Sequence, residues 1–199
     1  KTILSGHRFI SQIIASYNSP SRSYHNAAHI LDMLEFIKEK NQLVSETFWA
    51  VILHDVIMQD NNNLTVFGHH DKDISVEEKS AILVENLELT LGKGTIKTSK
   101  IKKHILATDY SKKISTKSIV SYADLAILFC DDNIYDDYSR NIRKEYSHYN
   151  DVDYAKGRLQ ILKSLFQTIQ DKKLFISEQD IIQRNMTREI EYLKKFFTH

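Results

Sequence analysis

Three short segments of the chain combine histidine and aspartate in a way that suits a divalent metal ion. They are residues 24–29 (YHNAAH), 52–55 (ILHD) and 122–126 (YADLA). Together they supply imidazole nitrogens and two carboxylates, a mixed set of ligands that suits Mn, Fe, Co, Ni, Zn or Mg. Such a set leaves positions around the ion open to water. We therefore expect a site that supports chemistry and not only structure.

The spacing of these residues limits how they share an ion. His25 and His29 are four positions apart, so on one helix both reach the same small region, although only one of them need bind the metal. His54 and Asp55 are adjacent, and within a helix their side chains diverge by about 100°, which places a shared ion beside the helix. Asp55 and Asp124 both lie in apolar runs, where a carboxylate without a partner costs several kcal/mol. A common metal ion would offset that cost.

Helices must position these residues, because turn residues are scarce and apolar residues recur at helical spacing. The 199 residues include only 5 glycines and 1 proline, too few for a β-rich fold. Apolar periodicity predicts helices over residues 2–17, 26–40 and 117–129, another from Ser45 through Val56, and further helices as far as residue 197. We therefore predict an all-α fold, a single domain over residues 1–199 with about eight helices.

Residues 59–73 interrupt the helical pattern. They are polar, rich in Asn, and contain the pair His69 and His70. We expect a loop here, and the two histidines are either ligands of a second metal or exposed loop residues. Immediately afterwards, Ser75 and Glu78 match a capping box, which places Glu77 and Glu78 in the first turn of the next helix.

Charge and apolar content exclude several classes of function. The chain has 27 basic and 26 acidic residues, a net charge of +1, so it has no overall field that attracts nucleic acid or a membrane surface. No apolar run approaches the roughly 18 residues of a membrane span. A single cysteine, Cys130, suits a reducing compartment. We expect a cytoplasmic protein that acts on a small molecule, without a membrane or nucleic-acid partner. The oligomeric state is left open.

On these residues, the chain resembles the HD superfamily of metal-dependent phosphohydrolases, named for the doublet that appears here as His54 and Asp55. Residues 24–30 (YHNAAHI) and 123–125 (ADL) also resemble motifs of cyclic-nucleotide phosphodiesterases, which belong to the same superfamily. Within it, the chain is most similar to a group of uncharacterised predicted HD phosphohydrolases of comparable length. That likeness extends along most of the chain and includes residues 77–81, 105–108, 142–146, 157–158, 185 and 189.

The resemblance implies both a ligand set and a reaction. The ligands are His29, His54, Asp55 and Asp124, with water in the remaining positions, and the identity and number of metal ions stay open. The implied reaction is hydrolysis of a phosphate ester or anhydride by water bound to the metal. We expect the phosphorylated substrate to be a nucleotide or another small metabolite. The alternative is a degenerate HD module that binds metal or nucleotide in a regulatory or interaction role.

Three further side chains are candidates for catalysis. His25 lies outside the implied ligand set and could protonate the leaving oxygen, because histidine titrates near pH ~6.5. Glu77 or Glu78 could orient the attacking water. Alternatively, both glutamates stabilise the helix N-terminus, and Glu78 is committed to the capping box with Ser75.

Basic side chains are expected to neutralise the charge of the phosphate. Arg22 immediately precedes the first histidine motif, and Lys79, Arg143 and Arg158 are the next candidates. We rank arginine first because its guanidinium binds two phosphate oxygens at once. Alternatively, Arg143 and Arg158 form ion pairs that join the late helices.

Two departures from the family pattern bear on the substrate and the metal count. Val76 stands where the smaller group has Asn, and residues 109–111 (DYS) stand where it has a histidine, which puts a second metal or a substrate contact in doubt. Residues 56–58 (VIM) follow the His-Asp doublet without the acidic pair of guanosine tetraphosphate hydrolases. We therefore do not expect an alarmone substrate.

Overall fold

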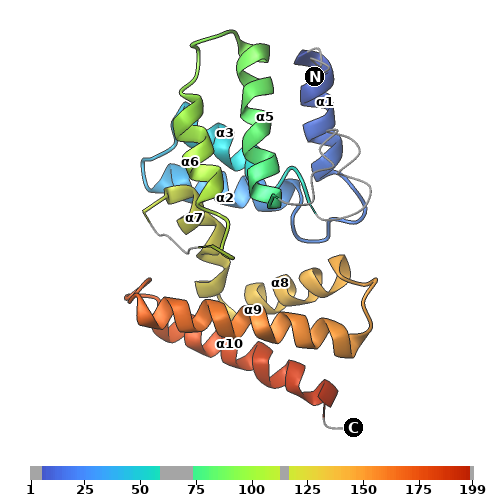
Figure 1. The fold of residues 1–199 in the computed structure, drawn as a ribbon. Helices are drawn as coiled ribbons and strands as arrows, with labels where there is room; N and C mark the ends of the chain where they lie inside the picture. The colour runs from blue at the N-terminus through green and yellow to red at the C-terminus, as the bar shows by residue number, and fades with distance from the viewer. Residues whose placement is uncertain (1–5, 59–73, 113–116, 198–199) are drawn as a thin grey trace. The chain divides into compact units, whose positions relative to one another are not determined.

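A computed structural model describes residues 6–58, 74–112 and 117–197 of the protein (Figure 1). Every regular element in these ranges is helical, which confirms the predicted all-α fold. None of the described helices is both long and apolar enough to cross a lipid bilayer. The polar segment 59–73, with His69 and His70, lies outside the described residues.

The chain divides into two compact units, Lys1–Asp124 and Leu125–His199. The division falls directly after the predicted ligand Asp124, so all the predicted ligands belong to the first unit. Each unit has its own group of buried apolar side chains. The single domain expected from chain length stays a prediction.

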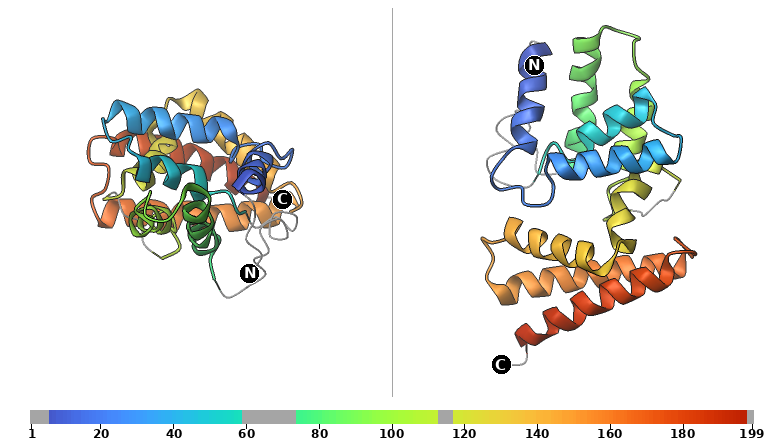
Figure 2. Two further views of the ribbon diagram at one scale, coloured as in Figure 1. Left: turned by 90° about the horizontal axis from the view of Figure 1, so that it is seen from above. Right: turned by 180° about the vertical axis from the view of Figure 1, so that it is seen from behind.

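The first unit is built around one apolar core. In Figures 1 and 2, α1 (Gly6–Tyr17) lies beside α5 (Val76–Leu91), and α5 lies beside α6 (Thr98–Leu106). The helix α2 (Ala27–Glu39) packs against α3 (Ser45–His54) and α7 (Ile119–Asp124). Side chains from several helices meet in the core with no exposed surface, including Phe9, Ile37, Val51, Leu83 and Ile101. This packing fixes the ends of the helices relative to one another.

The predicted capping box at the start of α5 is confirmed. The Ser75 N–H donates to Glu78 Oε2 at 2.8 Å, and the Glu78 N–H donates to Ser75 Oγ at 3.2 Å. These two bonds satisfy N–H groups that have no partner within the helix. They also hold the Glu78 side chain against the helix end.

The single helix expected over residues 117–129 is divided in the structure. α7 ends at Asp124, and residues 125–129 form the tighter 3-10 helix η1 (Leu125–Phe129). A short 3-10 turn at the end of an α-helix is common because it gives the last carbonyls alternative partners. The division places Asp124 at a helix end.

Three helices of the second unit meet at a buried ion pair. Arg158 Nε donates to Glu189 Oε1 at 2.8 Å, and the Tyr135 hydroxyl donates to Glu189 Oε2 at 2.7 Å. Asn185 Nδ2 donates to the carbonyls of Leu128 and Cys130, which attaches α10 (Gln179–Lys194) to the end of η1. These polar contacts join the helices of the unit. The elements after η1 are α8 (Asp132–Glu145), α9 (Asp151–Asp171), α10 (Gln179–Lys194) and the 3-10 helix η2 (Lys195–Phe197).

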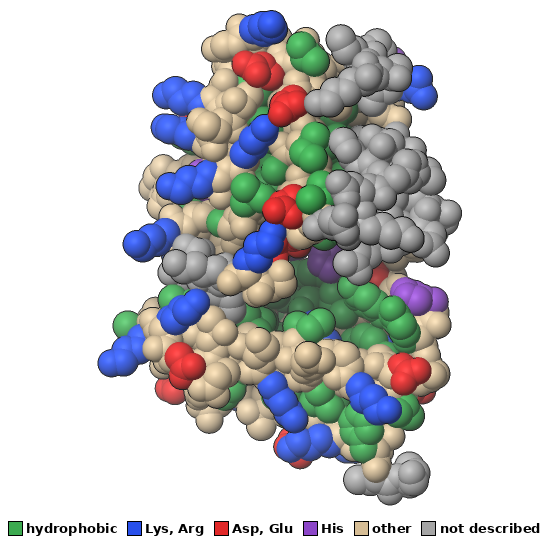
Figure 3. All heavy atoms as spheres, in the orientation of Figure 1, with side chains coloured by type: hydrophobic (Ala, Val, Ile, Leu, Met, Phe, Trp, Pro, Cys, Tyr) green, Lys and Arg blue, Asp and Glu red, His purple; other side chains and the backbone are tan. Residues whose placement is uncertain are grey.

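Basic side chains gather along the edge of the first unit where α6 lies (Figure 3). Lys97, Lys100 and Lys103 are exposed there. Acidic neighbours compensate part of this charge, since Lys102 pairs with Glu85 at 3.1 Å. The chain therefore has a local basic edge although its net charge is small.

Candidate metal centre

The four predicted ligands lie at helix ends. His29 is in the first turn of α2, His54 is the last residue of α3, Asp55 follows it as the C-cap, and Asp124 is the last residue of α7. One ligand atom from each of these side chains lies within 4.8 Å of the others. The structure thus brings together residues from three segments that the sequence separates by long intervals.

The two histidines of the first segment are divided between a loop and a helix, in agreement with the helix predicted over residues 26–40. Four-residue spacing on one helix therefore does not apply to this pair. Asn26 is the N-cap of α2, and its side chain accepts hydrogen bonds from the N–H groups of Ala28 at 2.8 Å and His29 at 3.4 Å. Asparagine is favoured at this position for that reason. His25 therefore precedes the helix. The His25 and His29 ring centroids are nevertheless 5.8 Å apart.

The His-Asp doublet lies where α3 ends. Asp55 has φ −111° and ψ 14°, so its backbone departs from helical geometry. The divergence of about 100° that we expected applies to two residues inside a helix. Here Asp55 Oδ2 instead lies 3.0 Å from His54 Nε2. The end of the helix therefore lets adjacent residues face one site.

Both ligand imidazoles have a buried nitrogen that no hydrogen bond from the described residues reaches. The side chains of His29 and His54 are 4% and 0% exposed, and in each ring this nitrogen is Nε2. His54 Nδ1 donates to the Val51 carbonyl at 2.8 Å, so in the neutral ring Nε2 carries the lone pair. A buried polar atom without a partner is costly. A metal ion bound to both Nε2 atoms would remove that cost, and these residues fit such an ion.

The two carboxylates form the more accessible side of the group. The side chains of Asp55 and Asp124 are 22% and 15% exposed. Asp55 Oδ2 lies 3.8 Å from His29 Nε2, and Asp124 Oδ1 lies 3.4 Å from the same atom. Water can therefore approach the group past the carboxylates. This accessibility matches a site with open positions.

Tyr110 is a site residue that the sequence did not identify. Its hydroxyl donates to Asp124 Oδ2 at 2.7 Å, which leaves Oδ1 to face the histidines. Tyr110 belongs to the segment 109–111, where the family pattern has a histidine. This departure from the family pattern indicated that the segment could differ in function. The spacing of the residues did not predict a contact between Tyr110 and Asp124.

Opposite charges in the group shift its pKa values. Burial opposes the charged form of His54, but the neighbouring Asp55 and Asp124 carboxylates outweigh it and raise the pKa of His54 well above its usual value. Burial likewise opposes the charged form of Asp55, yet the His54 and His25 imidazoles hold the pKa of Asp55 below its usual range. The pKa of Asp124 is also lowered, against the effect of burial, by His29 and His54. The metal-free group therefore favours ionised carboxylates beside a protonated imidazole.

His25 lies beside the ligand group without belonging to it. Its Nε2 atom is 3.9 Å from Asp55 Oδ2, and its side chain is 24% exposed. His25 is thus more accessible than either His29 or His54. Among these three imidazoles, the two candidate ligands are therefore buried and His25 is partly exposed.

The two glutamates of α5 have different surroundings. Glu78 is engaged in the capping box and pairs with Lys112 Nζ at 2.9 Å. Glu77 is half-buried, and its pKa is raised by burial and by the negative charges of Asp109 and Asp55. Glu77 therefore lies in the electrostatic field of the site.

The four basic residues predicted to bind phosphate lie in different settings. Arg158 is buried in the second unit, where it pairs with Glu189 at 2.8 Å. Arg22 is buried and donates to backbone carbonyls. Lys79 is buried in the first turn of α5 and forms no ion pair within the described residues. Arg143 belongs to the second unit, where it pairs with Asp151 at 2.8 Å and lies over the Tyr154 ring. Their roles in binding substrate stay predictions.

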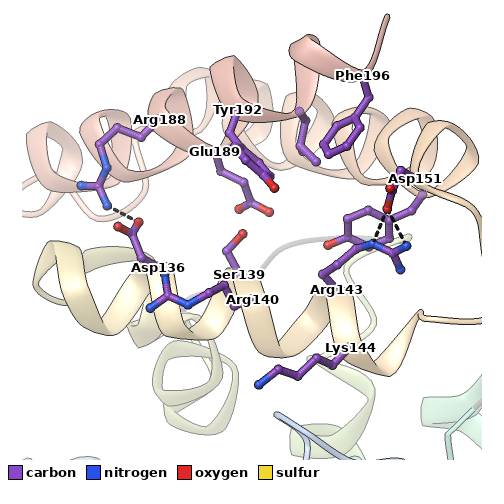
Figure 4. A pocket seen from close by; sticks show the side chains of 12 residues that line it. Asp136, Ser139, Arg140, Arg143, Lys144, Asp151, Arg188, Glu189, Tyr192 and Phe196 are labelled. Carbon is purple, nitrogen blue, oxygen red and sulfur yellow. Dashed lines mark hydrogen bonds and ion pairs between the residues drawn. The ribbon is translucent and has the colours of Figure 1, made fainter.

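A separate pocket of about 660 Å³ lies in the second unit between α8, α9 and α10 (Figure 4). Its charged side chains pair with one another: Arg188 with Asp136, and Arg143 with Asp151. Glu189, which also lines it, is engaged with Arg158. These charged side chains are therefore paired within the protein. The hydroxyl of Tyr154, another lining residue, is buried and has no hydrogen-bond partner among the described residues. Unlike the His-Asp group, the described part of this pocket does not bring together several candidate metal ligands.

No protein-family model, curated protein or solved structure matches this chain. The resemblance to the HD superfamily therefore stays a prediction. The interpretation of the site depends on its own geometry and chemistry.

Proposed function

We propose that the protein is a metal-dependent phosphohydrolase that cleaves a phosphate ester or anhydride of a nucleotide or other small metabolite. The observation that carries this proposal is the convergence of His29, His54, Asp55 and Asp124, whose ligand atoms lie within 4.8 Å of one another. Two imidazole nitrogens with two carboxylates suit Mn, Fe, Co, Ni, Zn or Mg. Such an ion, when bound, lowers the pKa of water and polarises a phosphoryl oxygen.

His25 is the proposed acid that protonates the leaving oxygen. Its Nε2 atom lies outside the ligand group but only 3.9 Å from Asp55 Oδ2, so it adjoins the position where a substrate would meet the site. Its partial exposure lets a substrate reach it. Imidazole is suited to this role because it exchanges protons near neutral pH.

Glu77 is the proposed residue that orients the attacking water. The capping box and Lys112 engage the Glu78 carboxylate, which leaves Glu77 as the better candidate. Its raised pKa, caused first by burial and then by Asp109 and Asp55, brings the carboxyl closer to the range in which it accepts and returns a proton near neutral pH. Val76 stands where the group that the chain resembles has Asn. Its side chain has no polar group that could orient water, so Glu77 remains the candidate.

Chelation followed by addition of single metals tests the proposal. The full chain is treated with EDTA, and hydrolysis of a panel of nucleotides, phosphomonoesters and phosphodiesters is measured after adding Mn²⁺, Zn²⁺ or Mg²⁺. We expect at least one metal to restore turnover in the wild type but not in Asp55→Asn. Asp137→Asn, which alters an exposed ion pair with Arg140, is the control and should retain activity. Metal binding without turnover of any substrate would contradict the enzyme and favour a regulatory module.

A further inference from the structure

Arg22 lies in the connection between α1 and α2 and is buried against the end of α3. The residue is 4% exposed. Its Nη1 atom donates to the carbonyl of His25 at 3.1 Å and to the carbonyl of Asp55 at 2.7 Å. Its Nη2 atom donates to the carbonyl of Val56 at 2.9 Å. One side chain therefore joins the turn before α2 to the turn after α3.

The end of α3 needs such partners because the last carbonyls of a helix have none within it. Two residues at the end of α1 contribute as well: Ser16 Oγ donates to the Val56 carbonyl at 2.6 Å, and the Tyr17 hydroxyl donates to the Ile52 carbonyl at 3.0 Å. The Arg22 guanidinium also lies over the Tyr17 ring at 5.0 Å and places positive charge where the helix dipole is negative. Ser16 and Tyr17 donate hydrogen bonds to the helix end, whereas Arg22 also binds the carbonyl of His25.

We propose that Arg22 is a positioning residue that sets the separation between the candidate acid His25 and the candidate ligand Asp55. The two carbonyls that share its Nη1 atom belong to the same two residues whose side chains approach to 3.9 Å. Because one nitrogen of Arg22 binds the backbones of both His25 and Asp55, it sets the distance between their side chains. This inference rests on the proposed function, because it assigns His25 and Asp55 to one site. It replaces a phosphate contact as the role of Arg22.

Two substitutions separate this role from a contribution to stability alone. Arg22→Lys keeps the charge but loses the planar fork that serves both turns. Arg22→Gln keeps one amide group that can serve a single turn, and it substitutes for Arg22→Lys if that variant does not fold. Tyr17→Phe is the matched control, because it removes one hydrogen bond from the end of α3 without affecting the link to His25.

The experiment measures Mn²⁺ affinity by calorimetry on the full chain, together with the unfolding temperature. We expect Arg22→Lys to weaken Mn²⁺ binding by about 10–100-fold, the usual effect of removing a group that orients metal ligands. Tyr17→Phe should leave the affinity nearly unchanged even where it lowers the unfolding temperature. In the metal-free protein, the ¹³C signals of the His25 and Asp55 carbonyls should shift together in Arg22→Lys and remain in place in Tyr17→Phe.

Each other outcome is decisive. Equal weakening by Arg22→Lys and Tyr17→Phe, or unchanged affinity in both, would overturn the positioning role. Unchanged Mn²⁺ affinity with weaker binding of inorganic phosphate in Arg22→Lys would instead show a substrate contact. Weakened Mn²⁺ binding in a protein that hydrolyses nothing would uphold the positioning role and refute the proposed reaction. A wild type that binds none of Mn²⁺, Zn²⁺ or Mg²⁺ would refute both.

Discussion

The hydroxyl of Tyr110 donates a hydrogen bond of 2.7 Å to Oδ2 of Asp124. Asp124 is therefore held by one oxygen, and its other oxygen, Oδ1, lies 3.4 Å from His29 Nε2. Burial and the charge of Asp124 raise the pKa of Tyr110 well above its usual value, so the phenol remains a neutral donor at physiological pH. An outer hydrogen bond of this kind orients the carboxylate before any metal binds.

Tyr110→Phe should therefore weaken divalent metal binding by about 10–100-fold, because Asp124 loses the bond that selects its free oxygen. The change removes one oxygen atom, so the fold should persist. Calorimetric titration with Mn²⁺ measures the effect, with Tyr192→Phe, an exposed tyrosine of the second unit, as the control. Equal Mn²⁺ affinity in Tyr110→Phe and wild type would contradict this account of Asp124.

Metal binding should stabilise the fold, since the ligands come from α2, α3 and α7 and converge only in the folded chain. At a free metal concentration 100 times Kd, the gain in unfolding free energy is about 2.7 kcal/mol. Thermal unfolding with Mn²⁺, and again after EDTA, measures it. Asp55→Asn should show little of this gain, and a full gain in that variant would place the metal elsewhere.

Metal binding should also release a proton and weaken as pH falls. The raised pKa of His54 means that the metal-free protein holds a proton on this imidazole at neutral pH, and the metal needs the neutral ring. In the metal-free protein, the same shift contributes stability that is full below the usual histidine pKa and is lost as pH rises through the raised one. Calorimetry in buffers with different ionisation enthalpies should show release of about one proton per ion. The Mn²⁺ affinity should be measured between about pH 6 and 8, where histidine ordinarily titrates. An affinity that does not change with pH in this range would argue against His54 as a ligand.

Glu77→Gln should affect mainly catalysis, and Glu78→Gln should affect mainly stability. Glu77→Gln should lower kcat by about 10²–10⁴-fold with little change in metal affinity, the usual loss for a group that transfers or orients a proton. Glu78→Gln should retain most of the activity and lower the unfolding temperature, because it weakens the capping box and the pair with Lys112. Steady-state kinetics and thermal unfolding measure the two effects. A larger loss of kcat in Glu78→Gln would reverse the assignment.

The second unit should depend on its buried ion pair. Glu189→Gln leaves the Arg158 guanidinium buried without an opposite charge and should cost about 3–5 kcal/mol of unfolding free energy. Urea denaturation measures the loss. Asp137→Asn, in the exposed pair with Arg140, should change stability little, because exposed pairs are well solvated. A small effect of Glu189→Gln would mean that water reaches the pair.

The sequence by itself determined the all-α fold and the residue types of the site. Helical periodicity and the scarcity of glycine and proline are local properties, and each expected helix depends on residues within a few turns. The capping box of Ser75 and Glu78 was predictable for the same reason, because both partners lie within one turn. The types of the metal ligands were also predictable, because histidine and aspartate in apolar runs need a partner when they are buried.

Only the tertiary structure decided how the site is held together. Arg22 binds the carbonyl of a residue 33 positions away, and Tyr110 binds Asp124 across 14 positions. No periodic pattern records such bonds, because they depend on which helix ends the core brings together. The turn at Asp55 likewise arises where α3 stops, and it lets two adjacent residues share one site. The local sequence pattern therefore determines the helices and the types of the ligands. The packing of the helices determines which oxygen and nitrogen atoms face one another and which side chains support them.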